Sequence, residues 1–234
     1  NLPENATLNQ VRLIPSSGCY KIEIVYTIQE KEPIQSDKIL GIDLGLNNLF
    51  TCITHKLDKP FIINGKPLKS VNQYYNKKKG KIQSQLEKNH KKKTSKKLQM
   101  LTRKRNNKIK DYLHKSTRIV VNYCVENQIS KVVIGYNKEW KQDINLGKKT
   151  NQNFVQIPFL QGINQLQYKL KLEGIECIIH EESYTSKCSA LDNEEVKKHE
   201  SYLGKRVKRG LFKTSEGILV NADVNGAINI LRKG

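Results

Sequence analysis

The sequence predicts an α/β fold in which antiparallel strands lead into a mixed sheet. Two observations carry this prediction: short apolar runs separated by turn residues from about residue 39, and helix and strand patterns that alternate from about residue 70 to the end. Strands in series followed by such alternation are typical of an α/β sheet. No apolar run approaches the roughly 20 residues of a membrane span, and no signal segment opens the chain. We therefore expect a soluble, intracellular protein.

The first residues predict a β-hairpin that stands apart from the rest. A turn is expected around Pro15 to Gly18, and a polar link, EKEPIQSDK, begins at residue 30. We assign residues 1–36 to this β unit and residues 37–234 to one main domain. Apolar residues alternate with polar ones after the turn, at Tyr20, Ile22, Ile24, Tyr26 and Ile28.

Three strands open the main domain, and a helical segment follows them. ILGIDLGLNNLFTCIT contains two apolar runs split by GLNN, and PFIINGKPL supplies a third strand that ends in an Asn-Gly turn. From Ser70 to about Asn127 the apolar residues recur at steps of three and four, and a charged stretch, KNHKKKTS, separates two groups of them. We expect a basic helical hairpin inserted at about 70–127.

The remaining elements alternate between strand and helix. KVVIG predicts a short buried strand, and a helix is expected from about Ile157 to Leu172, closed by Gly174. GIECIIH predicts the next strand, GILVN an extended piece, and DVNGAINILRK a terminal helix. This order is compatible with a ribonuclease H-like domain that carries the basic helical hairpin as an insertion.

Positive charge is concentrated in the helical segment. The chain has 42 Lys and Arg against 22 Asp and Glu, a formal net charge of +20. Between Lys69 and Lys115, seventeen basic residues face only Glu87 and Asp111, a net charge of +15. Clustered cations neutralise phosphates and release counterions, so we favour a nucleic-acid interface over a merely solvated helix face or a lysine-rich composition. The candidate contacts are Lys77, Lys78, Lys79, Lys91, Lys92, Lys93, Arg103 and Arg105.

Cysteine spacing indicates neither disulfides nor zinc. The five cysteines are scattered, and no Cys-x-x-Cys pair occurs. We expect reduced, mostly buried thiols. They are Cys19, Cys52, Cys124, Cys177 and Cys188.

Three acidic residues stand at the edges of predicted elements. Asp43 ends an apolar strand, Glu182 lies just past the strand ECIIH, and Asp223 opens the terminal helix. A buried carboxylate is costly unless it is paired or binds a metal, and Mg²⁺ takes oxygen ligands. Three such side chains could hold two divalent ions of the kind that assist phosphodiester cleavage. The structural alternatives are a turn residue for Asp43, a helix N-cap for Asp223 and a surface acid beside Glu181 for Glu182.

Longer motifs in this chain resemble a known family. The stretches GIDLGLNNLFTCIT, DYLHKSTRIVV, VVIGYNKEWKQ, NQNFVQIPF, EESYTSKCSALD, YLGKRVKRGLF and NADVNGAINILRK together resemble TnpB, the OrfB-type protein of bacterial insertion sequences. TnpB is related to type V CRISPR effectors and to Fanzor proteins. The resemblance covers nearly all of the chain from Ile39 on, and the opening hairpin resembles the last strands of the family's wedge domain.

The resemblance implies an RNA-guided DNA endonuclease with a RuvC-like nuclease domain of ribonuclease H fold. Its partners would be a guide RNA and target DNA, and base pairing would carry most of the sequence specificity. By motif, Asp43 corresponds to the first RuvC aspartate and Asp223 to the last. The implied cofactor is a pair of Mg²⁺ ions, with Mn²⁺ as a substitute, and the implied location is the bacterial cytoplasm beside the nucleoid.

The chain departs from the family pattern at two places. Relatives commonly carry the RuvC glutamate directly after the strand that here reads KVVIG, where this chain has Gly135. In a rearranged branch the glutamate precedes the TSK motif, and Glu182 occupies that place, with Glu181 as the alternative. Many relatives also carry two Cys-x-x-Cys pairs of a zinc ribbon. Here only Cys188 remains in the corresponding segment, about residues 186–220, so we expect no zinc.

Further nucleic-acid contacts are expected around this segment. Tyr184, Thr185, Ser186 and Lys187 would lie beside Glu182, and a plain turn is their alternative role. Three readings compete with the guided nuclease: a catalytically inactive guide-directed DNA-binding repressor, a DNA transposase or its accessory protein, and a nuclease that cuts without a guide. The backbone-contact candidates are Arg206 and Arg209.

Overall fold

The computed structural model describes residues 2–16, 19–56, 59–90, 93–137 and 157–234, apart from the side chains of residues 89 and 90. The helices are α1 (Lys66–His90), α2 (Lys96–Glu126), α4 (Phe159–Leu172) and α5 (Ala222–Lys233). The strands are β1 (Thr7–Ser16), β2 (Cys19–Thr27), β3 (Ile39–Leu44), β4 (Asn48–Thr54), β5 (Phe61–Asn64), β6 (Lys131–Gly135), β7 (Glu176–His180), β8 (Lys205–Lys208), β9 (Leu211–Lys213) and β10 (Leu219–Asn221).

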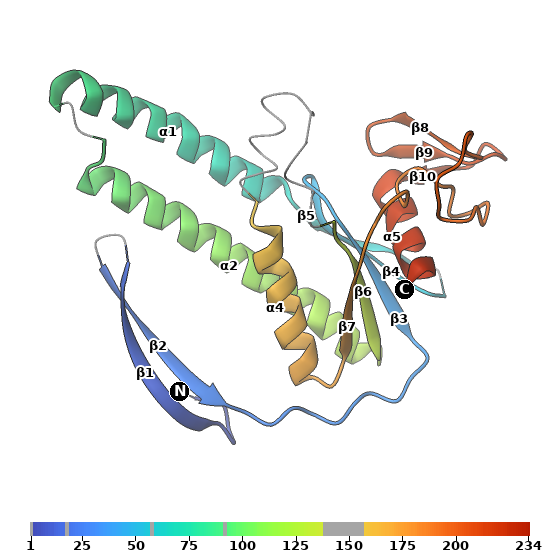
Figure 1. The fold of residues 1–234 in the computed structure, drawn as a ribbon, viewed down its shortest axis with the longest axis horizontal. Helices are drawn as coiled ribbons and strands as arrows, with labels where there is room; N and C mark the ends of the chain where they lie inside the picture. Colours follow the sequence, from blue (N-terminus) through green and yellow to red (C-terminus); the bar gives the residue numbers. More distant parts are fainter. Residues whose placement is uncertain (1, 17–18, 57–58, 91–92, 138–156) are drawn as a thin grey trace.

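The central sheet has five strands in the order β5-β4-β3-β6-β7 (Figure 1). Strands β3, β4 and β5 are antiparallel in series, whereas β6 and β7 run parallel to β3. Helical crossovers return the chain to the sheet for β6 and β7, as parallel neighbours require. The order and the strand directions confirm the predicted ribonuclease H-like mixed sheet.

The two faces of the sheet are covered by different helices (Figure 1). Alternate residues of β3 point to opposite sides, and Leu40 and Ile42 join the main core with residues of α2 and α4. Gly41 lies under α5, where an added Cβ would come within 2.7 Å of the Ala227 carbonyl oxygen. Glycine at this position therefore lets α5 approach β3 closely. Asp43 shares this face with Gly41, so its side chain is directed toward α5.

Helices α1 and α2 form the predicted basic hairpin and project beyond the sheet (Figure 1). The hairpin starts at Lys66, about one turn before the expected Ser70, because Pro67 suits a first helical turn and the Asn64 side chain accepts a hydrogen bond from the Lys66 backbone N–H. The C-terminal half of α2 packs into the core through Leu113, Val120, Cys124 and their neighbours. The opposite half carries the charged tip.

Strands β1 and β2 pair with each other and not with the central sheet. A register shift between Leu8 and Gln10 interrupts the ladder. Residues 28–38 then run as an extended link along the C-terminal end of α4, where the Ile34 backbone N–H donates to the Gly174 carbonyl. Large apolar side chains of this hairpin are more than half exposed, among them Val11, Leu13, Tyr20, Ile22 and Ile24.

A small second sheet, in the order β10-β9-β8, lies beside α5. The sequence predicted only the β10 piece; β8 and β9 are too short and too charged to be recognised by periodicity. Phe212 of β9 is 1% exposed, and Gly204 leaves the space that its ring fills. Among the described residues, no helix is both long and apolar enough to cross a membrane.

Candidate functional site

Asp43 lies in the middle of the sheet on the face that α5 covers. It pairs with Thr51 of β4 across the antiparallel ladder. On the other side, one step beyond the parallel pair of Ile42 and Ile134, it is next to Gly135 of β6. The carboxylate is half-buried, which places an acid among residues that are otherwise apolar or small.

Asp223 reaches the same place from the first turn of α5. The N-cap of this helix is Asn221, whose side-chain oxygen accepts from the backbone N–H groups of Asp223 and Val224. The N-cap alternative for Asp223 is therefore wrong. Its carboxylate accepts a 2.7 Å hydrogen bond from the Asn48 side-chain amide instead. One turn further along α5, a Cβ added at Gly226 would lie 3.3 Å from Oδ2 of Asp43, so the two aspartates face each other across this turn.

Glu182 follows β7 and turns back over β6. A Cβ added at Gly135 would lie 3.1 Å from Oε2 of Glu182 and 2.3 Å from a methyl carbon of Ile230. The Glu182 carboxylate thus occupies space into which a side chain at position 135 would extend. Glycine at position 135 therefore leaves room for the carboxylate of Glu182, which follows β7.

The neighbouring acid, Glu181, lies elsewhere. Its side chain is exposed and accepts a hydrogen bond from the Ser183 hydroxyl, and its backbone carbonyl accepts one from Lys233. It does not contribute to the electrostatic environment of Asp43. Of the two candidate glutamates, Glu182 is the one that the fold brings to the aspartates.

Asp43 is influenced by both of the other carboxylates. Burial raises the pKa of Asp43 well above its usual value, and the charges of Glu182 and Asp223 raise it further; a hydrogen bond from the Leu44 backbone and the charge of Arg206 act in the opposite direction. Burial raises the pKa of Glu182 to about 7. Oε2 of Glu182 and the Thr51 hydroxyl are both buried without a hydrogen-bond partner in the described part of the chain. Such a cluster is costly unless a cation neutralises it.

These residues fit a pair of hard divalent ions by their chemistry. Oxygen donors are what Mg²⁺ prefers, and the unpartnered Oε2 of Glu182 is a free donor at the centre of the cluster. Within the described ranges, no group of three His, Cys, Asp or Glu side chains is close enough to enclose one ion.

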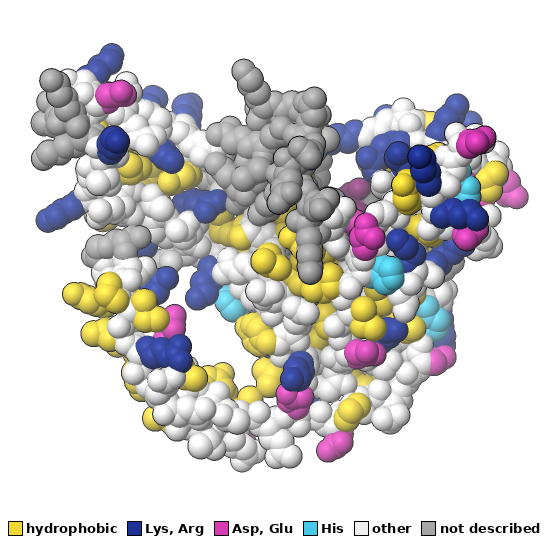
Figure 2. All heavy atoms as spheres, in the orientation of Figure 1, with side chains coloured by type: hydrophobic (Ala, Val, Ile, Leu, Met, Phe, Trp, Pro, Cys, Tyr) yellow, Lys and Arg dark blue, Asp and Glu magenta, His cyan; other side chains and the backbone are white. Residues whose placement is uncertain are grey.

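Basic side chains lie on one side of the site. Arg206 of β8 is exposed and close enough to lower the pKa of Asp43. Lys187 is also exposed, and its ammonium lies 5.9 Å from the ring centre of Tyr202. Figure 2 shows Lys and Arg side chains over this region as well as along the α1–α2 hairpin. Arg209 and Ser186 are exposed too, with no contact to the carboxylates.

Tyr184 and Thr185 form the turn that holds Glu182. Thr185 is 3% exposed, and its hydroxyl donates to the Glu182 carbonyl. Tyr184 adopts a left-handed φ of 67°, a conformation that non-glycine residues seldom adopt outside tight turns. The hydroxyl of Thr185 is therefore engaged in holding the backbone of Glu182, and its predicted phosphate contact stays a prediction.

The predicted contacts of the helical hairpin lie away from the carboxylates. They are on α1, on α2 and at the tip that joins them (Figure 1). The ammonium groups of Lys78 and Lys79 lie 5.7 and 5.9 Å from the ring centres of Tyr74 and Tyr75, respectively. Lys91 and Lys92 lie outside the described residues. The others, all described, are Lys77, Lys93, Arg103 and Arg105.

Sequence reasoning missed the amides that position the site. Asn48 was read only as part of the GLNN turn, although it binds Asp223. Asn225 and Asn229 of α5 are fully buried and hold the segment that follows Glu182: the Asn225 side chain accepts from the Ala190 backbone N–H and donates to the Cys188 carbonyl, both at 2.9 Å. The asparagines of NADVNGAIN were the available signal, because Asn is rare in a buried helix face.

We expect Asn225→Ala to lower the free energy of unfolding by about 2 to 4 kcal/mol, because the buried Ala190 backbone N–H loses its side-chain partner and the Cys188 carbonyl loses one of two, keeping the bond from Asn229. Urea denaturation of the full chain measures this. Asn122→Ala, at an exposed position of α2, is the control and should change stability little. Equal effects of the two substitutions would contradict the role given to Asn225.

Family comparisons cover most of the chain. The OrfB_IS605 model, described as a probable transposase, matches residues 23–141, and the model of the Cas12f1-like TNB domain matches residues 159–230. No curated protein matches the sequence.

Two solved structures share the fold. A cryo-EM structure of a Cas12f1–sgRNA–target DNA complex is 20% identical with a TM-score of 0.61, over 94% of this chain and 55% of that protein. A cryo-EM structure of a CRISPR-Cas12f ternary complex is 18% identical with a TM-score of 0.61, over 94% of this chain and 44% of that protein. This chain thus spans about half the length of either protein. Since the OrfB_IS605 model alone matches just over half of its residues, the chain belongs to the OrfB_IS605 family of probable transposases and is a TnpB-like protein.

Proposed function

We propose that this chain carries the nuclease centre of an RNA-guided DNA endonuclease of a transposable element, and that it hydrolyses phosphodiester bonds at the carboxylate site. The observation that carries the proposal is the convergence of Asp43, Glu182 and Asp223 from remote parts of the chain: burial raises the pKa of Asp43, and the charges of Glu182 and Asp223 raise it further. Perturbed acids grouped at one position are typical of catalytic sites.

Guide RNA and target DNA are the proposed partners. The net charge of +20 suits a polyanion, and the relatives of similar fold were solved as an sgRNA–target DNA complex and as a ternary complex. We assign sequence selection to base pairing with the guide. The corresponding location is the bacterial cytoplasm, beside the nucleoid.

Asp43, Glu182 and Asp223 would hold two Mg²⁺ ions, or Mn²⁺ in their place. When bound, such ions lower the pKa of an attacking water and stabilise the leaving oxygen. Asn48 holds one oxygen of Asp223 and so fixes the position of this carboxylate. Glu182 keeps one oxygen free of protein partners. Arg206, exposed beside the cluster, is suited to hold a phosphate of the substrate.

The test is to purify the full protein from cells that contain its native locus, sequence the RNA that copurifies, and assay cleavage of DNA that matches it. We expect cutting only with RNA, matching DNA and Mg²⁺ together, and none in EDTA. Cleavage of non-matching DNA, or cleavage without RNA, would contradict guidance. Joined rather than cut strands would support a transposase instead.

A second candidate is a guide-directed DNA binder without nuclease activity. Gly135 stands where relatives commonly carry the RuvC glutamate, and this departure is what favours it. The same purified complex distinguishes the two functions, because an inactive binder would retain matching DNA in Mg²⁺ and leave both strands intact.

A further inference from the structure

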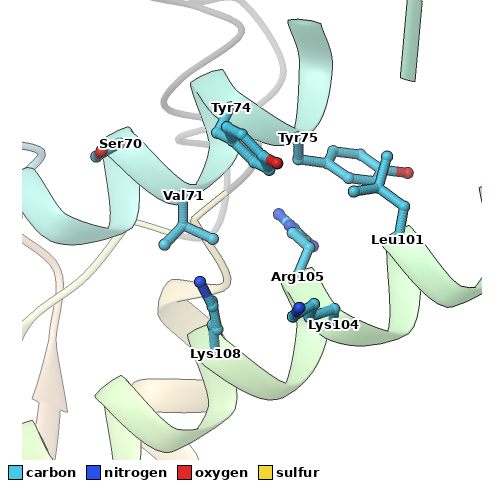
Figure 3. A pocket seen from close by; sticks show the side chains of 8 residues that line it. All are labelled: Ser70, Val71, Tyr74, Tyr75, Leu101, Lys104, Arg105 and Lys108. Atoms are coloured by element: carbon cyan, nitrogen blue, oxygen red, sulfur yellow. The ribbon is translucent and has the colours of Figure 1, made fainter. Parts of the chain in front are cut away.

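The seam between α1 and α2 is hollow over the outer part of the hairpin. One hollow of about 410 Å³ lies between the helices (Figure 3), and a second of about 520 Å³ adjoins it toward the tip. Tyr74, Leu101 and Lys104 line both. The other residues that line the first are Ser70, Val71, Tyr75, Arg105 and Lys108.

Lysines occupy seam positions of α2. Lys97, Leu101, Lys104 and Lys108 recur at steps of three and four and line these hollows, a spacing that puts them on one face of the helix. Two packed helices normally place apolar residues at such positions. Here three of the four positions hold lysine, and no acid lines either hollow.

Of the three cations that line the first hollow, Arg105 is held by a neighbouring side chain, whereas Lys104 and Lys108 are free to bind a ligand. The Arg105 guanidinium donates a 2.8 Å hydrogen bond to the Asn72 side chain and lies 5.8 Å from the ring centre of Tyr75. Lys104 and Lys108 are exposed, and neither makes an ion pair or hydrogen bond with the residues that the structure describes. Both lie on α2 near Arg105 and line the same hollow (Figure 3). The three side chains together give the hollow a positively charged lining that suits an anion.

An aromatic ring stands beside these cations. Tyr74 is 60% exposed and projects from α1 beside both hollows (Figure 3), and the Lys78 ammonium lies 5.7 Å from its ring centre. A large aromatic ring exposes apolar surface to water, and a flat ligand that stacks on it removes that surface from water. The pairing of an exposed ring with unpartnered cations matches the way single-stranded nucleic acid is bound, with bases on aromatic platforms and phosphates on Lys and Arg.

We propose that this hollow binds an unpaired nucleotide, whose base stacks on Tyr74 and whose phosphate lies among Lys104, Arg105 and Lys108. A base inside a duplex is already stacked on its neighbours on both faces, so the body of a duplex would use the cations without covering the ring. An acidic peptide would likewise leave Tyr74 unused. This hollow would be a binding subsite for the nucleic-acid partner of the proposed function. Only the identity of the bound strand rests on that function.

The test measures binding and needs no cleavage. Full-length protein in EDTA is titrated with single strands of about 12 nucleotides, within the range that compact single-strand sites cover, and with the duplex of the same sequence. Tyr74→Leu should weaken single-strand binding about tenfold, as expected for the loss of one stacked base, and leave duplex binding unchanged. Tyr74→Phe keeps the ring and should bind like the wild type.

Charge is tested with a matched pair of double variants. The slope of log K against log salt is negative for nucleic-acid binding. Lys104→Gln/Lys108→Gln should make it less steep by about 1.4 for single strands, the amount expected for the loss of two phosphate contacts. Lys81→Gln/Lys110→Gln removes the same charge from exposed positions that line neither hollow and should leave the slope unchanged.

Two results would overturn the proposal: unchanged single-strand affinity in Tyr74→Leu, or equal losses in the two lysine double variants. Comparing RNA with DNA of one sequence identifies the strand; tighter RNA binding assigns the subsite to the guide, and tighter DNA binding to a displaced DNA strand. Since the titrations contain EDTA, a protein without nuclease activity can still pass them, so failure of the proposed function is separable from failure of this inference.

Discussion

Asp43→Asn is expected to reduce Mg²⁺-dependent cleavage of guide-matched DNA at least about a thousand-fold, equivalent to roughly 4 kcal/mol of transition-state stabilisation. Asparagine keeps the size of the side chain but removes the carboxylate on which the charges of both Glu182 and Asp223 act. A neutral amide binds a divalent ion far less strongly than a carboxylate. Single-turnover cleavage rates at saturating Mg²⁺ measure the effect.

Glu181→Gln is the matched control for this prediction. It also removes one carboxylate, but from an exposed side chain that lies outside the cluster, and it should cut at the wild-type rate. A second measurement separates lost chemistry from lost folding: Mg²⁺ should raise the Tm of the wild type and of Glu181→Gln, and should not raise that of Asp43→Asn. Wild-type cleavage by Asp43→Asn would refute the assignment of this residue.

Glu182→Gln is expected to stabilise the metal-free protein above neutral pH. The folded protein holds the pKa of Glu182 at about 7, against 4.5 for the free side chain. A raised carboxyl pKa means that wild-type stability is complete below pH 4.5 and falls as pH rises through 7, because the buried group must then ionise. Glutamine cannot ionise, so at about pH 8 the variant should be more stable by up to about 3 kcal/mol.

Urea denaturation in EDTA at about pH 4 and about pH 8 tests this, since the difference between the two proteins should open only at the higher pH. Added Mg²⁺ should stabilise the wild type at the higher pH and leave Glu182→Gln unaffected, because only the carboxylate gains from a cation. Glu181→Gln again serves as the control and should show neither effect. Equal pH dependence in wild type and Glu182→Gln would mean that Glu182 is not buried in the cluster.

Local pattern was sufficient for most of the fold. The strand KVVIG coincides with β6 and GIECIIH contains β7, because short apolar runs between polar turns have few other ways to bury themselves. The helical hairpin followed from spacing and charge in the same way. The small β8–β9 hairpin was missed, since KRVK is exposed along its length and its fold depends on Phe212 packing against Gly204.

The sequence by itself determined the chemistry available to this protein: a basic surface, a ribonuclease H-like order of elements, and acids at the ends of three of them. Only the tertiary structure decided which acids meet. Glu181 and Glu182 are adjacent in the chain and alike in composition, yet one is exposed and the other lies over Gly135. That choice depends on how α5, β6 and the turn at Thr185 pack together, because a carboxylate's environment is set by groups far away in sequence, which no local pattern encodes.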